Sequence, residues 1–195
     1  MKKIIFFVLF ACTFLVNANQ ADAQIRIGAI LNAPNEISTN TEQLEKLNIR
    51  LAELLPSDKY EVLPIQEMME KEKEYRRNKN IFQAPNQLTP PALSQEALCE
   101  LGKNSNCDYL VLIKQEYTDA VRKYVILVPG SPEKKINLTT NIKIFNIGTK
   151  QEKTLKEYKN RAGMRRGNKD LPQALVRAFD DFLKDLVIDP AKDIQ

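Results

Sequence analysis

The sequence predicts a single α/β domain of the α+β type, in which helices pack on a mixed β-sheet. Three observations support this prediction: amphipathic helical segments separate the early strand-like segments, a nearly continuous apolar segment lies in mid-chain, and a glycine turn joins two long alternating segments. Helices between strands permit parallel crossovers, whereas a short turn requires an antiparallel pair. The predicted order is therefore β-α-β, an insertion, and then α-β-β-β-α.

The N-terminus has the three zones of a secretory signal peptide, which we predict over residues 1–23. Lys2 and Lys3 precede an apolar run over residues 4–16, and a polar stretch follows. A membrane-spanning helix needs about 20 apolar residues, and this run is shorter. A small-x-small pattern ends at Ala23, so we predict cleavage after Ala23.

Two alternatives exist for the processing of this terminus. The first is a cut after Ala18. The second is a lipid anchor at Cys12, because the preceding residues loosely resemble a lipobox. We interpret the site otherwise: Phe10 is bulky where a small residue is usual, and residues 13–16 are still apolar. We therefore predict a periplasmic or secreted domain over residues 24–195, without a lipid anchor.

The first part of this domain predicts a strand, a helix and a short strand. Residues 25–31 alternate and then become fully apolar, as a strand does when it enters a core. Thr39 and Glu42 are spaced as a capping box before a helix. Residues 60–65 predict a second strand, which Pro64 limits to a short or edge position because proline has no backbone donor. The apolar face of the helix consists of Leu44, Leu47, Leu51, Leu54 and Leu55.

Residues 67–92 interrupt the pattern. Residues 67–79 are densely charged and helix-prone, and residues 80–91 are polar and rich in proline. We interpret the stretch as an insertion or a lid-like excursion. Two roles are open for it: a solvated helix and loop without function, or an element that docks a partner.

The middle of the chain predicts a helix and the central strand. Residues 93–101 place leucine and alanine on one helical face, and Gly102 is placed as the residue that follows a helix. Residues 108–113 are almost all apolar, which is typical of a strand covered on both faces. Residues 124–128 extend or repeat this strand.

The last part predicts a hairpin and a closing helix. Residues 136–147 alternate regularly, and a turn at Gly148 leads into a strand near residues 154–159. Asp170 and Gln173 are arranged as a helix cap. The buried stripe of the closing helix consists of Leu171, Leu175, Phe179, Phe182, Leu183 and Leu186.

Two cysteines belong to the mature chain, Cys99 and Cys107. An exported protein folds in an oxidising compartment, where two such cysteines can pair. We predict a disulfide between them. The alternative is a pair of buried free thiols.

The composition excludes several classes of chemistry. The chain contains no histidine, and Ser-His-Asp catalysis, Cys-His catalysis and histidine-bound zinc all need an imidazole. We expect no catalytic residue, no metal site and no cofactor. The net charge is only +4 and no basic stripe is concentrated in the sequence, so we expect no nucleic-acid partner.

A basic turn over residues 163–169 precedes the closing helix. The glycine spacing does not match a Walker phosphate loop, and Asp170 at the next position would repel an anion. We interpret Arg165, Arg166 and Lys169 as candidates for docking an acidic partner.

The helix over residues 93–102, followed by Asp108, Tyr109 and an apolar strand, resembles a step found in a periplasmic α/β superfamily. The long alternating strand, the glycine hairpin and the closing amphipathic helix continue the resemblance, which covers about residues 25–190 in element order. This superfamily comprises CsgG-like curli secretion lipoproteins, the amino-terminal domain of TolB, and LpoB-like activators of peptidoglycan synthases.

The resemblance implies a non-enzymatic module that docks other cell-envelope proteins through its exposed sheet or loops. Our hypothesis is an exported protein-binding adaptor or assembly factor in the periplasm. The missing lipobox is a departure from the lipid-anchored members, and no family site residue is carried over. The alternative is a histidine-free secreted protein that binds or hydrolyses glycans, with two facing carboxylates in a cleft.

Overall fold

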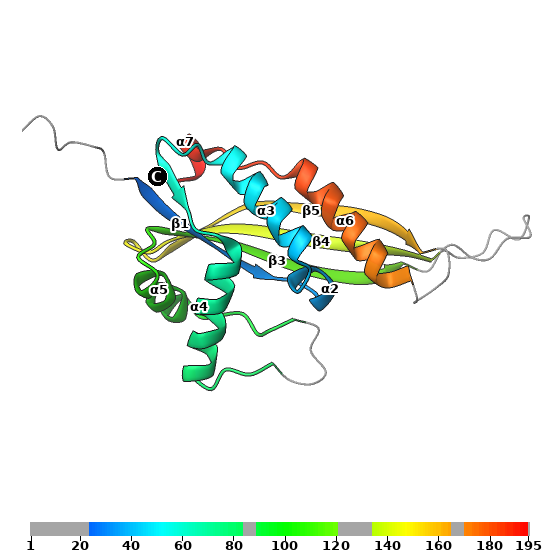
Figure 1. The fold of residues 1–195 in the computed structure, drawn as a ribbon, viewed down its shortest axis with the longest axis horizontal. Helices are drawn as coiled ribbons and strands as arrows, with labels where there is room; N and C mark the ends of the chain where they lie inside the picture. The colour runs from blue at the N-terminus through cyan, green and yellow to red at the C-terminus, as the bar shows by residue number, and fades with distance from the viewer. Residues whose placement is uncertain (1–23, 84–88, 121–133, 165–169, 195) are drawn as a thin grey trace, which may run out of the picture.

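The computed structural model describes residues 24–83, 89–120, 134–164 and 170–194. The predicted signal peptide lies outside these residues. The described chain forms a single five-stranded mixed sheet with helices packed on it, which confirms the predicted fold class (Figure 1). The strands are β1 (Ile25–Asn32), β2 (Tyr60–Val62), β3 (Tyr109–Ala120), β4 (Lys134–Asn146) and β5 (Gln151–Met164).

The sheet has the order β2-β1-β3-β4-β5. β1 is parallel to both of its neighbours, and β3, β4 and β5 are successively antiparallel. The parallel pairing of β1 and β3 ends where Asn32 lies opposite Lys114, although β3 continues to Ala120 alongside β4. The second half of β3 therefore extends beyond the end of β1.

Helices cover both faces of the sheet (Figure 1). On the first face, they bury the side chains of Ile27, Val111 and Ile142. On the second face, they bury Ile30 and Leu110. The first face carries α2 (Asn35–Ser38), α3 (Thr41–Leu54) and α6 (Leu171–Asp185), the second carries α4 (Ile65–Asn78) and α5 (Gln95–Asn104), and α7 (Pro190–Asp193) ends the chain.

The predicted apolar faces of two helices are confirmed. In α3 and just after it, Leu44, Leu47, Leu51 and Leu55 are buried. The stripe of α6 is buried as predicted from Leu175 onward and includes Phe179, Phe182, Leu183 and Leu186. Tyr158 of β5 packs edge-on against Phe182, with ring centroids 5.4 Å apart.

Of the two predicted helix caps, the one of α3 was wrong, whereas Asp170 lies at the predicted cap position of α6. The cap of α3 is Asn40, whose Oδ1 accepts hydrogen bonds from the backbone N–H groups of Glu42 (3.1 Å) and Gln43 (3.3 Å). Asn40 has the extended backbone that a cap requires, whereas Thr39 ends α2 in a helical conformation. Asp170 is the N-cap residue of α6, but its side chain makes no capping hydrogen bond and its backbone is not extended (φ −94°, ψ 1°).

Gly102 was predicted to follow a helix, but it lies inside α5. A Cβ at this position would overlap Cδ1 of Ile147, so the glycine allows α5 to approach the end of β4 closely. The left-handed residue after α5 is Asn106, with φ of 53°. Packing, rather than helix termination, explains the glycine.

Residues 67–92 were predicted to be an insertion or a lid-like excursion, but part of this stretch packs on the domain. α4 begins at Ile65, directly after Pro64, and this start shortens β2 to three residues at the edge of the sheet. Ile65, Met68 and Tyr75 of α4 are buried against the sheet. The charged residues between them obscured this apolar face in the sequence.

The long hairpin is confirmed. β4 begins two residues before the predicted strand and ends at Asn146, and β5 extends beyond the predicted residues 154–159 at both ends. β3 also continues past the apolar residues into a polar stretch that ends at Ala120. The strand predicted near residues 124–128 lies outside the described residues.

Candidate functional site

The carboxyl end of β1 opens into a crevice. α3 follows β1 on one face of the sheet, and α4 follows β2 on the opposite face. Such connections open a crevice at the carboxyl ends of the strands, where ligands of open α/β sheets bind. We call it the β1-end crevice. It has three adjoining hollows of about 890, 340 and 490 Å³, and the residues shared between their linings are Asn32, Glu72, Arg76, Pro90, Ala92 and Lys114.

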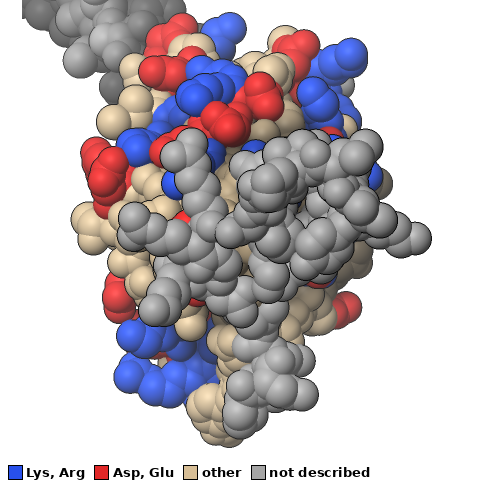
Figure 2. Space-filling view, turned by 90° about the vertical axis from the view of Figure 1, so that its right-hand side faces the viewer, with Lys and Arg blue, Asp and Glu red and all other residues tan. Residues whose placement is uncertain are grey.

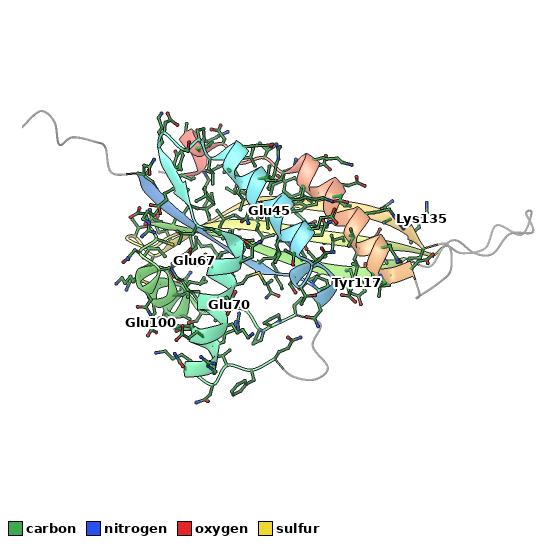
Figure 3. The ribbon with its side chains drawn as sticks, in the orientation of Figure 1. Glu45, Glu67, Glu70, Glu100, Tyr117 and Lys135 are labelled. Atoms are coloured by element: carbon green, nitrogen blue, oxygen red, sulfur yellow. The ribbon has the colours of Figure 1, made fainter. Side chains whose placement is uncertain are left out.

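The largest hollow lies between α2 and α4. α2 contributes Asn35 and Ser38, and α4 contributes charged side chains that include Glu67 and Glu70 (Figure 3). Phe82, from the segment after α4, also lines this hollow and is 69% exposed. The hollow therefore combines polar and charged walls with an exposed aromatic ring.

A buried ion pair separates the largest hollow from the smallest one. Nε and Nη2 of Arg76 both donate to Oε1 of Glu72, at 2.8 and 2.6 Å. The side chains are only 12% and 10% exposed. Nη1 of Arg76 is buried without a partner among the described residues, so one donor at the crevice is unused.

Burial changes the acidity of Glu72. Loss of hydration raises the pKa of this carboxyl above its ordinary value, and the Arg76 guanidinium opposes the rise without cancelling it. Glu72 and Arg76 are four residues apart on α4, and both side chains are nearly buried. Removal of one partner would leave an uncompensated charge, which is costly.

Interactions with neighbouring helices hold α4 in place. The Tyr75 hydroxyl donates to Oε2 of Glu100 on α5 at 2.9 Å, and Lys79 forms an ion pair with Oε1 of the same carboxylate at 2.9 Å. Oδ1 of Asn48 on α3 accepts a hydrogen bond from the backbone N–H of Ile65 at 2.8 Å. Both ends of α4 are thus fixed.

The segment 89–93 crosses the crevice. Nδ2 of Asn32, the last residue of β1, donates to the carbonyl oxygen of Pro90 at 2.9 Å. Leu93 packs against the second-face core. The segment is therefore attached to the end of β1, and it lines all three hollows.

The smallest hollow, of about 340 Å³, has an apolar floor and charged walls. Ile30 and Leu112 belong to its lining, as do the carboxylates Glu72 and Glu152. Nζ of Lys143 forms an ion pair with Glu152 at 2.7 Å. Each of the two carboxylates is therefore paired with a cation.

Two further ion pairs lie around the crevice. Lys71 contacts Glu67 at 2.8 Å, and Lys114 contacts Glu116 at 2.6 Å. Figure 2 shows basic and acidic side chains side by side at the top of the view and a group of basic side chains at its lower left.

Cys99 and Cys107 are buried free thiols. The structure therefore contains the alternative, two free thiols, and not the predicted disulfide. Sγ of Cys99 lies 3.8 Å from the carbonyl oxygen of Ile147, and Sγ of Cys107 lies 3.8 Å from that of Ser105. Burial raises the pKa of the Cys107 thiol to about 11. The two sulfur atoms face different neighbours.

Arg165, Arg166 and Lys169, the predicted docking residues, lie outside the described residues. They stay a prediction. The residues that the structure brings together at the crevice were not singled out in the sequence. One signal was present: Met68, Glu72 and Tyr75 follow helical spacing, which places Glu72 on the apolar face of α4.

The described helices include none with the length and apolar character to span a membrane. In the part of the chain that the structure describes, no three His, Cys, Asp or Glu side chains gather as a metal site requires.

Comparison with known proteins gives no family assignment. No protein-family model matches the chain, and no curated protein matches it by sequence. The resemblance to CsgG-like proteins and to TolB therefore stays a prediction.

Several solved structures are similar to parts of the chain. Lipoprotein GNA1162 from Neisseria meningitidis is 15% identical, with a TM-score of 0.43, over 83% of this chain and 99% of that one. A putative neuraminyllactose-binding hemagglutinin homolog from Helicobacter pylori is 11% identical, with a TM-score of 0.41, over 85% and 84%. The LpoB C-terminal domain from Salmonella enterica is 12% identical, with a TM-score of 0.36, over 76% and 92%. Values this low do not establish a common fold or function.

Proposed function

We propose that this chain is an exported cell-envelope protein that acts as an adaptor or assembly factor, by binding another envelope protein in the β1-end crevice and not by catalysis. Export is supported by the signal-peptide pattern over residues 1–23. Binding is supported by the position of the crevice at the carboxyl ends of β1 and β2.

One observation carries the proposal: Phe82 is an exposed aromatic side chain in the lining of a hollow of about 890 Å³. Exposed aromatic residues next to a hollow are typical anchors of protein interfaces. The paired charges on α4 suit such an interface because a partner can cover them without leaving a charge unpaired.

One observation favours the glycan alternative: Glu72 and Glu152 line the same hollow of about 340 Å³. Both carboxylates are engaged by cations, which favours a structural role. If these carboxylates catalyse glycan hydrolysis, the wild type should release sugar from purified peptidoglycan, and Glu152→Gln should abolish that release. This result would support the alternative. We expect no release by the wild type or by the variant.

The protein-binding proposal is tested by photo-crosslinking in cells. We expect a benzophenone amino acid at Phe82 to capture an envelope protein from the exported full chain. The matched control is the same amino acid at Ile49, which is 53% exposed on α3 and does not line the crevice.

The measurement is the yield of the crosslinked species identified by mass spectrometry. With a crosslinker placed at the neighbouring Gln83, Phe82→Ala should lower the yield by about tenfold, because truncation of an anchor costs on the order of 1–2 kcal/mol. Equal yields at Phe82 and Ile49 would contradict the proposal.

A further inference from the structure

The smallest hollow of the crevice, of about 340 Å³, lies over two neighbouring rows of residues on the second face of the sheet. The first row is apolar, because Ile30 of β1 lies opposite Leu112 of β3. The second row is polar: Asn32 lies opposite Lys114, which lies opposite Asn141 of β4. Side chains two residues apart on a strand point to the same face, so the floor is apolar at one row and polar at the next.

The walls add to the apolar part of this hollow. Leu98 of α5 belongs to the same core cluster as Ile30, and Leu93 packs against that cluster. Both leucines line the hollow. An apolar group that enters it can therefore be covered by aliphatic side chains from the sheet, from α5 and from the segment before α5.

The charged part of the hollow carries both signs in balance. Of the described residues in the lining, Arg76, Lys114 and Lys143 are cations, and each forms an ion pair with a glutamate. An ammonium has three donors and a carboxylate has two accepting oxygens, so these pairs retain hydrogen-bonding capacity. The side chains of Lys114 and Lys143 are 50% and 42% exposed, so a ligand can reach them. The balance suits a ligand that itself carries one charge of each sign.

Two polar groups behind these ion pairs are incompletely bonded. Oδ1 of Asn32 and Nη1 of Arg76 have no partner among the described residues, although both side chains line the hollow. Both atoms are buried, so they set the polarity of this wall, and the more exposed lysines and Glu152 are the groups available for direct contact. The hollow therefore combines an acceptor and a donor in its wall with an apolar floor.

From these features we infer that the smallest hollow binds an apolar α-amino acid as a zwitterion. The carboxylate of the ligand accepts from the lysines Lys114 and Lys143, its ammonium donates to Glu152, and its side chain packs on Ile30 and Leu112. Ligand pockets measure about 300–1,000 Å³, so this small one suits a ligand of about one or two residues. A dipeptide with apolar side chains has the same chemistry and is the second source of such a ligand.

The inference goes beyond the proposed function, because Phe82 lines the largest hollow and not this one. Its test is a titration of the purified mature chain with leucine, followed by the NMR signals of the backbone amides. We expect a Kd of about 1 mM or lower, with shifts at Asn32, Lys114 and Asn141 but not at Lys159 of β5. A separate titration with leucyl-leucine identifies the source: tighter binding than leucine favours the dipeptide, and weaker binding favours the free amino acid. No shift with either ligand at about 10 mM would overturn the inference.

Three further ligands test each part of the recognition. N-acetylleucine lacks the ammonium, leucinamide lacks the carboxylate, and glycine lacks the apolar side chain. Each should bind about tenfold more weakly than leucine, since each loses either a hydrogen-bonded charge or a buried side chain. Binding of N-acetylleucine or leucinamide as tight as that of leucine would show recognition of a single charge and would overturn the zwitterion.

Variants of the protein test the assigned contacts. Lys114→Gln and Glu152→Gln should each raise the Kd for leucine by about tenfold. The matched control is Lys159→Gln: Nζ of Lys159 forms an ion pair with Glu157 at 2.7 Å, also two residues away on one strand, and it lines none of the three hollows. The amide spectra report whether each variant is folded. Equal affinities of Lys114→Gln and Lys159→Gln would overturn the inference.

The outcomes separate this inference from the proposed function. Leucine binding without capture of a protein at Phe82 would support the amino-acid site and contradict the adaptor. Capture at Phe82 without binding of leucine or leucyl-leucine would leave protein binding intact and overturn the amino-acid site.

Discussion

Glu72 and Arg76 show how individual charges come to belong to a core. Both side chains are nearly buried and hydrogen-bonded to each other. Burial raises the pKa of Glu72 despite the adjacent guanidinium, so the folded state holds this proton more tightly than the unfolded chain does.

Stability should therefore depend on pH through Glu72. Where the folded state binds more protons, the free energy of unfolding falls as the pH rises from the ordinary pKa of 4.5 through the raised value. Urea unfolding from about pH 3 to about pH 7 should show that wild type loses stability relative to Glu72→Gln across this window. The variant also has a pH-independent offset, because Arg76 retains only a neutral partner.

Glu100 provides the control of opposite sign. Hydrogen bonds from Lys79 and Tyr75 lower the pKa of this carboxyl, so its contribution is present above 4.5 and is lost as the pH falls. Wild type should lose stability relative to Glu100→Gln on acidification. The same slope for both variants would contradict the assignment of Glu72.

At the scale of elements, α4 is the helix whose place in the fold differs most from the prediction. Its density of charge indicated a solvated segment, yet Ile65, Met68 and Tyr75 are buried. Met68 lies so close to β1 that a Cβ on Gly28 would be 2.9 Å from its Sδ. α4 therefore both completes the second-face core and forms a wall of the crevice.

This role predicts a large effect of truncation on the free energy of unfolding. Met68→Ala should destabilise the domain by about 2–5 kcal/mol, since it removes a fully buried side chain and leaves a cavity. Lys73→Ala, on the exposed side of the same helix, should change stability by about 0.5 kcal/mol or less. Urea denaturation measures both. A small effect of Met68→Ala would restore the view of α4 as an excursion.

At the scale of the whole molecule, the predicted signal-peptide cleavage site comes directly before the first strand of the folded domain. β1 begins at Ile25, and its first backbone N–H donates to the carbonyl oxygen of Lys59 at 2.9 Å. β1 is the first described strand in the chain and lies inside the sheet. A mature chain that begins at Gln24 therefore retains every described strand.

Export can be tested on the intact chain. The mass of the protein recovered from the periplasm should correspond to a start at Gln24, and Ala23→Leu should leave most of it uncut because signal peptidase needs a small residue there. Asp22→Ser is the control and should be processed normally. A start at Asn19 would favour the second cut, and an acylated Cys12 would contradict the proposed free protein.

The strands and most helices could be predicted because their signals are local. The alternation over residues 136–147 and the leucine stripes of α3 and α6 each follow from spacing along one element. The cap of α3 was wrong because of local backbone geometry, since Thr39 and Asn40 are both good capping residues and only Asn40 adopts the extended conformation.

The sequence by itself determined the export pattern, the mixed α/β architecture and the exclusion of histidine chemistry, because these depend on composition and on short-range periodicity. Only the tertiary structure decided that α4 belongs to the core, that Gly102 accommodates Ile147, and that Asn32, Glu72 and Phe82 line one crevice. These facts arise from contacts between segments far apart in the chain, and no local pattern encodes which faces will meet.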